Sequence, residues 1–266
     1  MNIFLKEMKS YRKSLIFWSI GVFLMVASGM AKYAAYSSSG QSINDLIADL
    51  PKSLKAVMGF GVVDLSKISG YYSLLYIYLL LMATIHAAML GASIIAKEER
   101  DKTAEFLFTK PVSRTAIITA KLVAACMNIV IFNLVTLASV VTLIEKYNNT
   151  GEAVNGEIVL TQVGMFILQV LFLVIGSSLA AVKKKPKTAP SLATGILLVT
   201  YMLSIAIDLN EKMEGMKYLT PFKYFEAKNV MLGRGLEPLY IVISLIVIAL
   251  LLVVTFTFYK RRDLSA

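Results

Sequence analysis

The sequence predicts an all-α, polytopic membrane protein with six transmembrane helices, a short cytoplasmic helix and interfacial helices on the outer side. The first observation is composition, because 57% of the 266 residues are hydrophobic and mean hydropathy is +0.70, more apolar than soluble domains. The second is six apolar runs, each long enough to cross a bilayer. The third is the distribution of charge between these runs. We expect residues 1–266 to form a single transmembrane domain.

The first thirteen residues alternate apolar and basic side chains, a pattern typical of an amphipathic helix at the membrane surface. A disordered basic tail is the alternative. The first predicted span follows, with Trp18 near one interface and Tyr33 near the other, as in the aromatic belts of membrane proteins. The six predicted spans cover about residues 15–35, 71–96, 116–144, 158–182, 189–207 and 239–259.

Two longer segments between spans are patterned but too polar to cross lipid. Residues 37–70 place apolar side chains at helical spacing, and Pro51 can begin a second helical piece there. Residues 208–238 repeat this behaviour, with Tyr218, Phe222, Phe225 and Val230 at helical spacing. We interpret both segments as interfacial helices on the outer side.

Charge distribution predicts the orientation of the chain. With both termini in the cytoplasm, 17 of the 27 basic residues and six of the 17 acidic residues lie on the inner side, a net charge of about +11 against about −1 outside. Anionic lipid at the inner leaflet explains this surplus. The net charge of +10 therefore gives no reason to expect nucleic acid as a partner.

Residues 97–115 are the most unusual stretch, because six consecutive ionisable residues, 97–102, follow a long apolar run. Each would cost roughly 2.5–3.5 kcal/mol at the bilayer centre. Thr103 is a candidate N-cap, and Glu105 in the first turn suits the helix dipole. Leu107 and Phe108 fall on one face. Pro111 ends the turn.

The short amphipathic helix predicted here has two interpretations. It either lies on the lipid surface or presents a docking surface to a cytoplasmic protein. Acidic side chains nearly balance the basic ones in this stretch, and acids facing an anionic leaflet are unfavourable. The composition therefore favours a protein partner. Ser113 can cap the following helix.

The run from residue 95 to residue 121, IAKEERDKTAEFLFTKPVSRTAIITAK, resembles the signature of ABC-2 type permeases, the membrane subunits of ATP-driven exporters. Lys102 stands where the family usually has Gly. Residues 218–235 and the tail 258–264 also resemble the family, so the likeness covers essentially the whole chain. The residues that fit the signature are Thr103, Glu105, Leu107, Pro111, Val112, Ser113, Arg114 and Lys121.

The resemblance implies a permease that works with a separate ABC ATPase, which would hold ATP and Mg, and with a second copy or a related permease. No G-x-x-x-x-G-K-[ST] loop occurs in the sequence, and one His and one Cys cannot build a zinc or thiol centre. We therefore expect no catalysis and no cofactor in this chain. The residues implied in contact with the ATPase are Glu98, Glu99, Thr103, Glu105, Leu107, Phe108, Pro111 and Arg114.

Polar groups inside the spans are candidates for a translocation path. His86 is the single histidine and lies in the second span, although a packed neutral side chain explains it as well. Asn128 and Asn133 either bond across helices or line a polar path. Phe222 and Phe225 are expected to cap that path from outside. Small residues at 91–93 and 176–178 predict close helix approach, and Lys121 can snorkel to the inner surface.

Taken together, these features predict the permease subunit of an ABC exporter in the plasma membrane. The alternative of an ion-coupled secondary transporter is disfavoured, because no predicted span carries an internal Asp or Glu and Asp208 lies only at a span end. A membrane scaffold or enzyme is the other alternative, and no paired carboxylates or nucleophile–base set support an enzyme. Nothing in the sequence specifies the cargo.

Overall fold

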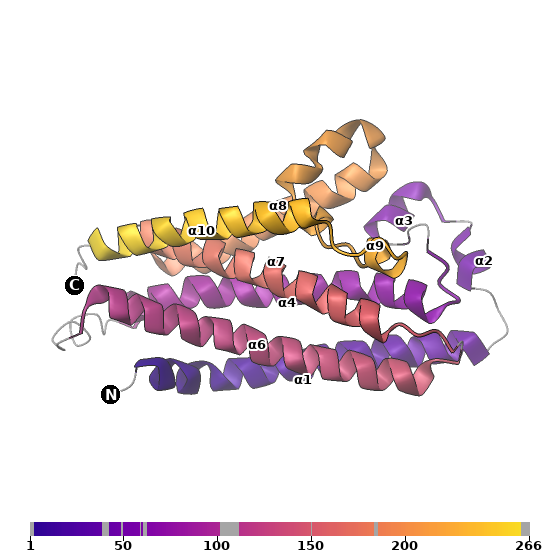
Figure 1. The fold of residues 1–266 in the computed structure, drawn as a ribbon, viewed down its shortest axis with the longest axis horizontal. Coiled ribbons are helices and arrows are strands. Elements are labelled where there is room, and N and C mark those ends of the chain that lie inside the picture. The colour runs from indigo at the N-terminus through magenta and orange to yellow at the C-terminus, as the bar shows by residue number, and fades with distance from the viewer. Residues whose placement is uncertain are drawn as a thin grey trace.

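The computed structural model is a bundle of long helices that run roughly along one direction (Figure 1). It describes residues 3–38, 43–48, 50–58, 60, 63–101, 112–149, 151–183 and 186–261, and all regular structure in these ranges is helical. The predicted all-α class is confirmed, and six described helices are long and apolar enough to cross a membrane. They are α1 (Ile3–Ser38), α4 (Ile68–Arg100), α6 (Arg114–Tyr147), α7 (Asn155–Val182), α8 (Ala189–Leu209) and α10 (Pro238–Arg261).

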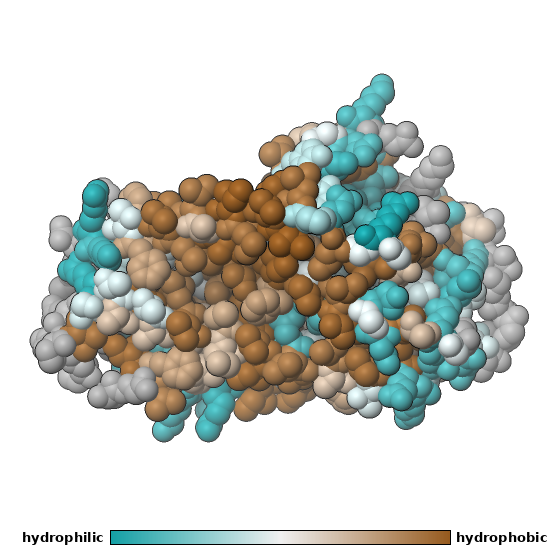
Figure 2. Space-filling view, viewed as in Figure 1, coloured by the Kyte–Doolittle hydropathy of each residue, from teal (hydrophilic) through white to brown (hydrophobic). Residues whose placement is uncertain are grey.

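The two ends of the bundle differ in what they carry. Both chain termini lie at one end, together with the end of α4 and the start of α6; we call this the terminal end (Figure 1). The short helices α2 (Ile43–Ala48), α3 (Lys52–Val57) and α9 (Ala227–Met231) gather at the opposite, distal end. An apolar band separates polar side chains at the two ends of the visible face (Figure 2).

Local sequence signals explain several helix boundaries. The Ser113 side chain accepts a hydrogen bond from the amide of Ala116 at 3.2 Å, so the predicted N-cap of α6 is confirmed. Pro190 lies in the first turn of α8, and α10 begins at Pro238, where a missing amide hydrogen costs nothing. Lys97 and Arg100 in the last turn of α4 complement the helix dipole.

The core of the bundle is the contact between α4 and α7. A Cβ added at Gly91 would lie 2.0 Å from the carbonyl oxygen of Leu173, and one added at Gly176 would lie 2.3 Å from that of Ala88. The backbones therefore touch where both helices lack a side chain. Ser177 strengthens the contact by donating to the Gly91 carbonyl at 3.2 Å. The predicted close approach of the two small-residue clusters is confirmed.

The beginning of the chain differs from the expectation of a separate surface helix. α1 is continuous from Ile3, so residues 3–13 extend the helix of the first span. The reason is that this segment finds partners on other helices. Glu7 pairs with Lys97 of α4, and Met8 accepts a weak contact from the Asn128 amide of α6 at 3.2 Å. These contacts hold the first turns of α1 against the bundle.

The segment after α8 also differs from its predicted helical pattern. It forms two 3₁₀ helices, η2 (Glu211–Leu219) and η3 (Pro221–Lys223), before the single turn of α9. Thr220 and Pro221 break the pattern, because Pro221 has no amide hydrogen to continue η2. The break turns the chain back, so that α9 lies beside α4 and α7.

The outer helices leave most of their apolar surface uncovered. In the most apolar stretch of α10 only 17% of the residues are buried, whereas in that of α4 72% are buried. Side chains such as Val199 of α8 and Val253 of α10 are exposed. Contiguous exposed apolar surface of this kind is typical of contact with lipid or with another protein.

Candidate functional site

A buried group of charges lies at the terminal end, beside the two helices that flank residues 102–111. Lys121 of α6 is 0% exposed, and its Nζ lies 2.7 Å from Oε1 of Glu98 and 3.6 Å from Oε1 of Glu7. The same Nζ donates to the carbonyl of Ile94 at 2.7 Å. The expected snorkelling of Lys121 to the surface is wrong, because these acceptors satisfy its charge inside the bundle.

Glu7 completes this group, which we call the terminal charge cluster: Glu7, Lys97, Glu98 and Lys121. Glu7 is 2% exposed and accepts from Lys97 Nζ at 2.9 Å. The cluster joins α1, α4 and α6, and its two acids balance its two bases. Removing one partner of a buried ion pair leaves an uncompensated charge, so the four residues act as a unit.

The residues expected to meet the ATPase are only partly within the described structure. Glu98 points into the terminal charge cluster and is 13% exposed, and Glu99 follows it on α4. Arg114 begins α6 and donates from Nη1 to the carbonyl of Lys260 at 2.8 Å, which ties α6 to the end of α10. The expected contacts that lie outside the described residues are Thr103, Glu105, Leu107, Phe108 and Pro111.

Midway along the bundle, His86 lies between two aromatic rings. Its ring centroid is 5.4 Å from that of Trp18 on α1 and 5.1 Å from that of Phe132 on α6. Trp18 therefore packs against the bundle, and its expected place near a membrane interface stays a prediction. His86 is buried, and its Nδ1 has no hydrogen-bond partner among the described residues.

The two asparagines of α6 bond within the bundle. Asn128 donates to the carbonyl of Ala124 at 2.8 Å. Asn133 donates to Gln169 of α7, whose amide in turn donates to the Ala83 carbonyl of α4 at 3.3 Å. A chain of hydrogen bonds thus crosses three helices. In this arrangement the side chains join helices, and their expected role along a path stays a prediction.

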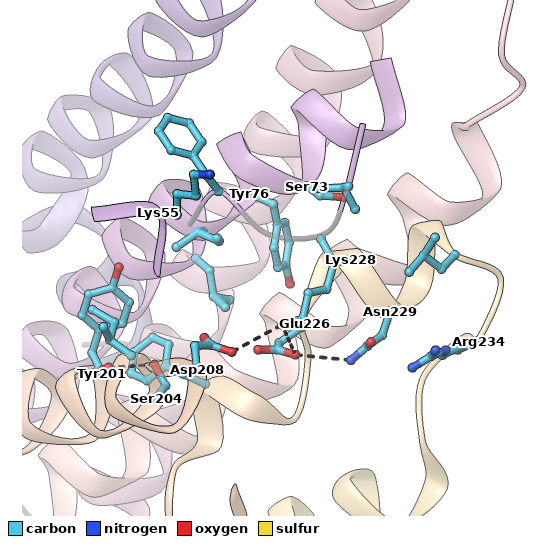
Figure 3. Close-up of a pocket in the computed structure, with 18 residues that line it drawn as sticks. Lys55, Ser73, Tyr76, Tyr201, Ser204, Asp208, Glu226, Lys228, Asn229 and Arg234 are labelled. Atoms are coloured by element: carbon cyan, nitrogen blue, oxygen red, sulfur yellow. Dashed lines mark hydrogen bonds and ion pairs between the residues drawn. The ribbon is translucent and has the colours of Figure 1, made fainter. Parts of the chain in front are cut away.

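A cavity of about 610 Å³ opens at the distal end between α3, α4, α8 and the segment that contains α9 (Figure 3). Its walls combine apolar side chains, such as Leu80 and Ile205, with charged ones, such as Arg234 and Lys55. The volume is within the range of small-molecule sites.

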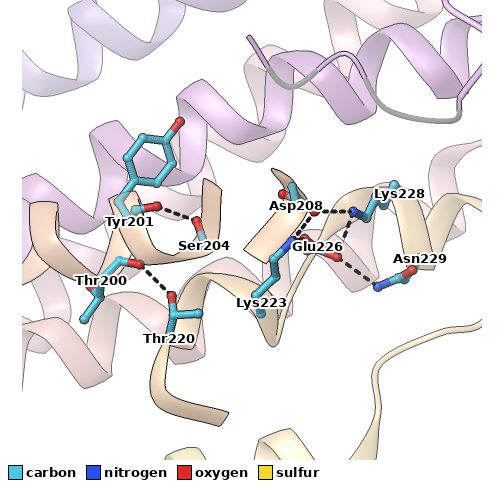
Figure 4. Close-up of polar contacts among 9 residues, drawn as sticks. All are labelled: Thr200, Tyr201, Ser204, Asp208, Thr220, Lys223, Glu226, Lys228 and Asn229. Carbon is cyan, nitrogen blue, oxygen red and sulfur yellow. Dashed lines mark hydrogen bonds and ion pairs between the residues drawn. The ribbon is translucent and has the colours of Figure 1, made fainter. Parts of the chain in front are cut away.

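Beside the cavity lies a second charged group, the distal charge cluster: Asp208, Lys223, Glu226 and Lys228 (Figure 4). Lys223 donates to Asp208 at 2.5 Å and to Glu226 at 2.6 Å. Lys228 Nζ lies 3.2 Å from Glu226 and 3.6 Å from Asp208. Burial alone lowers the pKa of Lys228, but the two carboxylates outweigh it and hold that pKa above its usual value.

Comparison of the sequence with known protein families adds to the helical architecture and the terminal charge cluster. The sequence matches the family described as ABC-2 family transporter protein over residues 1–264. The chain belongs to this family. It is therefore a permease subunit of an ABC transporter. No curated protein matches the sequence significantly.

In this ABC-2 permease, the two phenylalanines expected over the path are buried within the chain. The Phe222 ring lies 5.5 Å from that of Phe172 and 5.3 Å from that of Tyr201. Phe225 is 1% exposed and packs over Gly164. Tyr218, the third member of the predicted aromatic face, is exposed. The face is therefore split, and two of its members anchor the distal segment to α7 and α8.

Sequence reasoning about the permease missed Glu7 and the distal charge cluster. Glu7 is the single acid among the first thirteen residues, which otherwise carry only basic charge. An isolated acid in a basic segment is a signal of a specific basic partner. Lys223, Glu226 and Lys228 sit at short spacings that indicate mutual pairing, but their contact with Asp208 depends on the turn at Pro221.

Proposed function

We propose that this permease is the membrane subunit of an ATP-driven exporter and that a separate cytoplasmic ABC ATPase contacts residues 98–114. Its membership of the ABC-2 family supports the pairing with an ATPase, because such permeases normally work with one and dimerise. The ATPase would bring ATP and Mg. Two copies of this chain, or this chain and a related permease, would enclose the transport path.

The observation that carries the proposal is the terminal charge cluster. In the sequence, residues 102–111 connect α4, which ends two residues after Glu98, to α6, on which Lys121 lies. Glu98 and Lys121 tie these two helices together, and Glu7 adds α1 to the same unit. A push on residues 102–111 would thus reach three helices together, which suits the coupling of nucleotide closure to movement of the spans.

The charge distribution supports an orientation in which the terminal end faces the cytoplasm and the permease lies in the plasma membrane. Single cysteines placed in a variant that lacks Cys126 test this. Thiol reagents applied to intact cells should label a cysteine at Asp45 or Thr150 and spare one at Lys102 or Lys185. Labelling at Lys102 from outside would overturn the orientation.

The decisive experiment is co-purification of the ATPase with permease variants. We expect Glu105→Ala and Leu107→Asp to lower recovery of the ATPase, because truncating an interface anchor costs about 2 kcal/mol or more, roughly thirtyfold in affinity. Lys13→Ala is the matched control, since Lys13 is exposed on α1 at the same end. If both variants insert normally, retain the ATPase like the control and still export, the proposed contact is wrong.

A further inference from the structure

The distal cavity has a polarity gradient along the bundle axis. The α4 residues that line it are Ser73, Tyr76, Ile77 and Leu80, in order from the distal end towards the middle of the bundle. Leu80 lies twelve residues into α4, roughly 18 Å along the helix at 1.5 Å per residue. The charged side chains of Glu226, Lys228 and Arg234 lie towards the distal side of the cavity, and Asp208 is in the last turn of α8 (Figure 3).

The deeper walls of the cavity are largely apolar, with Ser204 as a polar exception. On the α8 side, the cavity is lined by Tyr201 and Ile205, which precede Asp208 on the helix. Phe222 adds an aromatic ring. The gradient from charged to apolar therefore runs in the same direction as the gradient across one leaflet of a bilayer. A ligand that fits both parts has one polar end and one apolar end.

Charge selects the sign of the polar end. The two acids that line the cavity, Asp208 and Glu226, are each paired with Lys223 and Lys228. Lys55 donates to the carbonyl of Ala48 at 2.8 Å, and among the residues that the structure describes neither Lys55 nor Arg234 has an ion pair. The described lining thus carries three basic side chains, Lys55, Lys228 and Arg234, against two acidic ones, and this excess favours an anionic group.

From these observations we propose that the distal cavity binds an anionic amphiphile with a single acyl chain. The carboxylate or phosphate of the ligand would contact Arg234, and its chain would lie along Ile77, Leu80 and Ile205. The proposal goes beyond the permease function and does not depend on it, because binding at equilibrium needs neither ATP nor the ATPase.

The test uses the full chain in nanodiscs of zwitterionic phosphatidylcholine and a dansyl-labelled long-chain fatty acid. We expect saturable binding above that of empty nanodiscs. Arg234→Gln should lower the affinity about tenfold, because it removes one charge-assisted contact. Ile205→Trp should abolish saturable binding by filling the apolar part of the cavity. Both residues are at least partly exposed, so neither change should prevent folding.

Two controls separate this site from the general lipid surface. Lys32→Gln removes an exposed charge at the distal end of α1, outside the cavity, and should leave the affinity unchanged. The alcohol analogue with the same chain should bind about tenfold more weakly than the acid. Equal affinity of acid and alcohol, equal affinity of the native chain and Arg234→Gln, or binding no greater than in empty nanodiscs would each overturn the proposal.

Discussion

The Nζ of Lys121 lies 2.7 Å from Oε1 of Glu98, and the lysine side chain has no exposed surface. This pair joins the last turns of α4 to α6, the helices on either side of residues 102–111. Two charges buried in an apolar bundle are unfavourable unless they neutralise each other. The pair therefore fixes the relative position of α4 and α6 at the end where the ATPase contact is proposed.

Replacing Lys121 with Met tests this relationship. The change leaves Glu7 and Glu98 with Lys97 as their one basic partner in the cluster, so we expect a loss of about 3–5 kcal/mol in the free energy of unfolding. Thermal unfolding of the purified permease measures the effect. Lys13→Met, at an exposed position of α1, should change stability by less than about 0.5 kcal/mol.

A double-mutant cycle shows whether Lys121 acts through Glu98. The combined variant Lys121→Met with Glu98→Gln should be more stable than the sum of the two single losses predicts, by about 1 kcal/mol or more. Strict additivity would show that the two side chains do not stabilise each other. In that case the terminal charge cluster is not a unit.

The six helices could be predicted from sequence because each is a long apolar run, and lipid permits little besides helices there. The contacts of Glu7 could not be predicted in the same way. Periodicity gives the apolar face of residues 1–13, but it does not say whether that face meets lipid or α4. The answer came from Lys97 and Lys121, which are distant in sequence and become neighbours only after α4 and α6 pack.

The contact of α4 with α7 gives a second prediction. In Gly91→Ala the added methyl group would lie 2.0 Å from the Leu173 carbonyl oxygen, so the helices must separate. We expect a loss of about 1–3 kcal/mol. Gly195→Ala in α8 is the matched control, because nothing lies within 4 Å of its added Cβ. That change should stabilise the helix by about 0.5–1 kcal/mol, and a loss of equal size at both positions would contradict the close contact.

The candidate sites were less predictable than the fold. The pattern of residues 208–238 correctly placed Phe222 and Phe225 among the apolar positions, yet it did not reveal the break at Pro221. That break points both rings towards the bundle and brings Lys223 to Asp208. Spacing along the sequence predicts which side chains share a face only within one continuous helix. The distal cavity could not be predicted from it, because the cavity depends on the turn at Pro221.

Phe225 supplies a third prediction. Phe225→Ala removes a buried ring that packs over Gly164, and we expect a loss of about 3–5 kcal/mol in stability. Tyr218→Ala is the comparison, since Tyr218 is 47% exposed, and it should cost much less. Heating followed by size-exclusion chromatography measures both. If Phe225→Ala is as stable as Tyr218→Ala but lowers transport, the ring serves the path and not the fold.

The distal charge cluster gives a prediction in pH. The pKa of Lys228 lies above its ordinary value of 10.5 because Glu226 and Asp208 favour the charged amine more than burial disfavours it. A raised pKa in the folded state means that this contribution is complete below about pH 10.5 and is lost as pH rises through the folded value. The side chain is 37% exposed, so solvent screening limits the contribution to about 1 kcal/mol or less.

The Tm of the native chain should therefore exceed that of Lys228→Gln at about pH 8, and the difference in Tm should close above pH 10.5. Lys212→Gln, at an exposed position of η2, should show no gap at either pH. A gap for Lys228→Gln that widens with rising pH would show that the amine is disfavoured in its charged form, contrary to the pairing with Glu226 and Asp208.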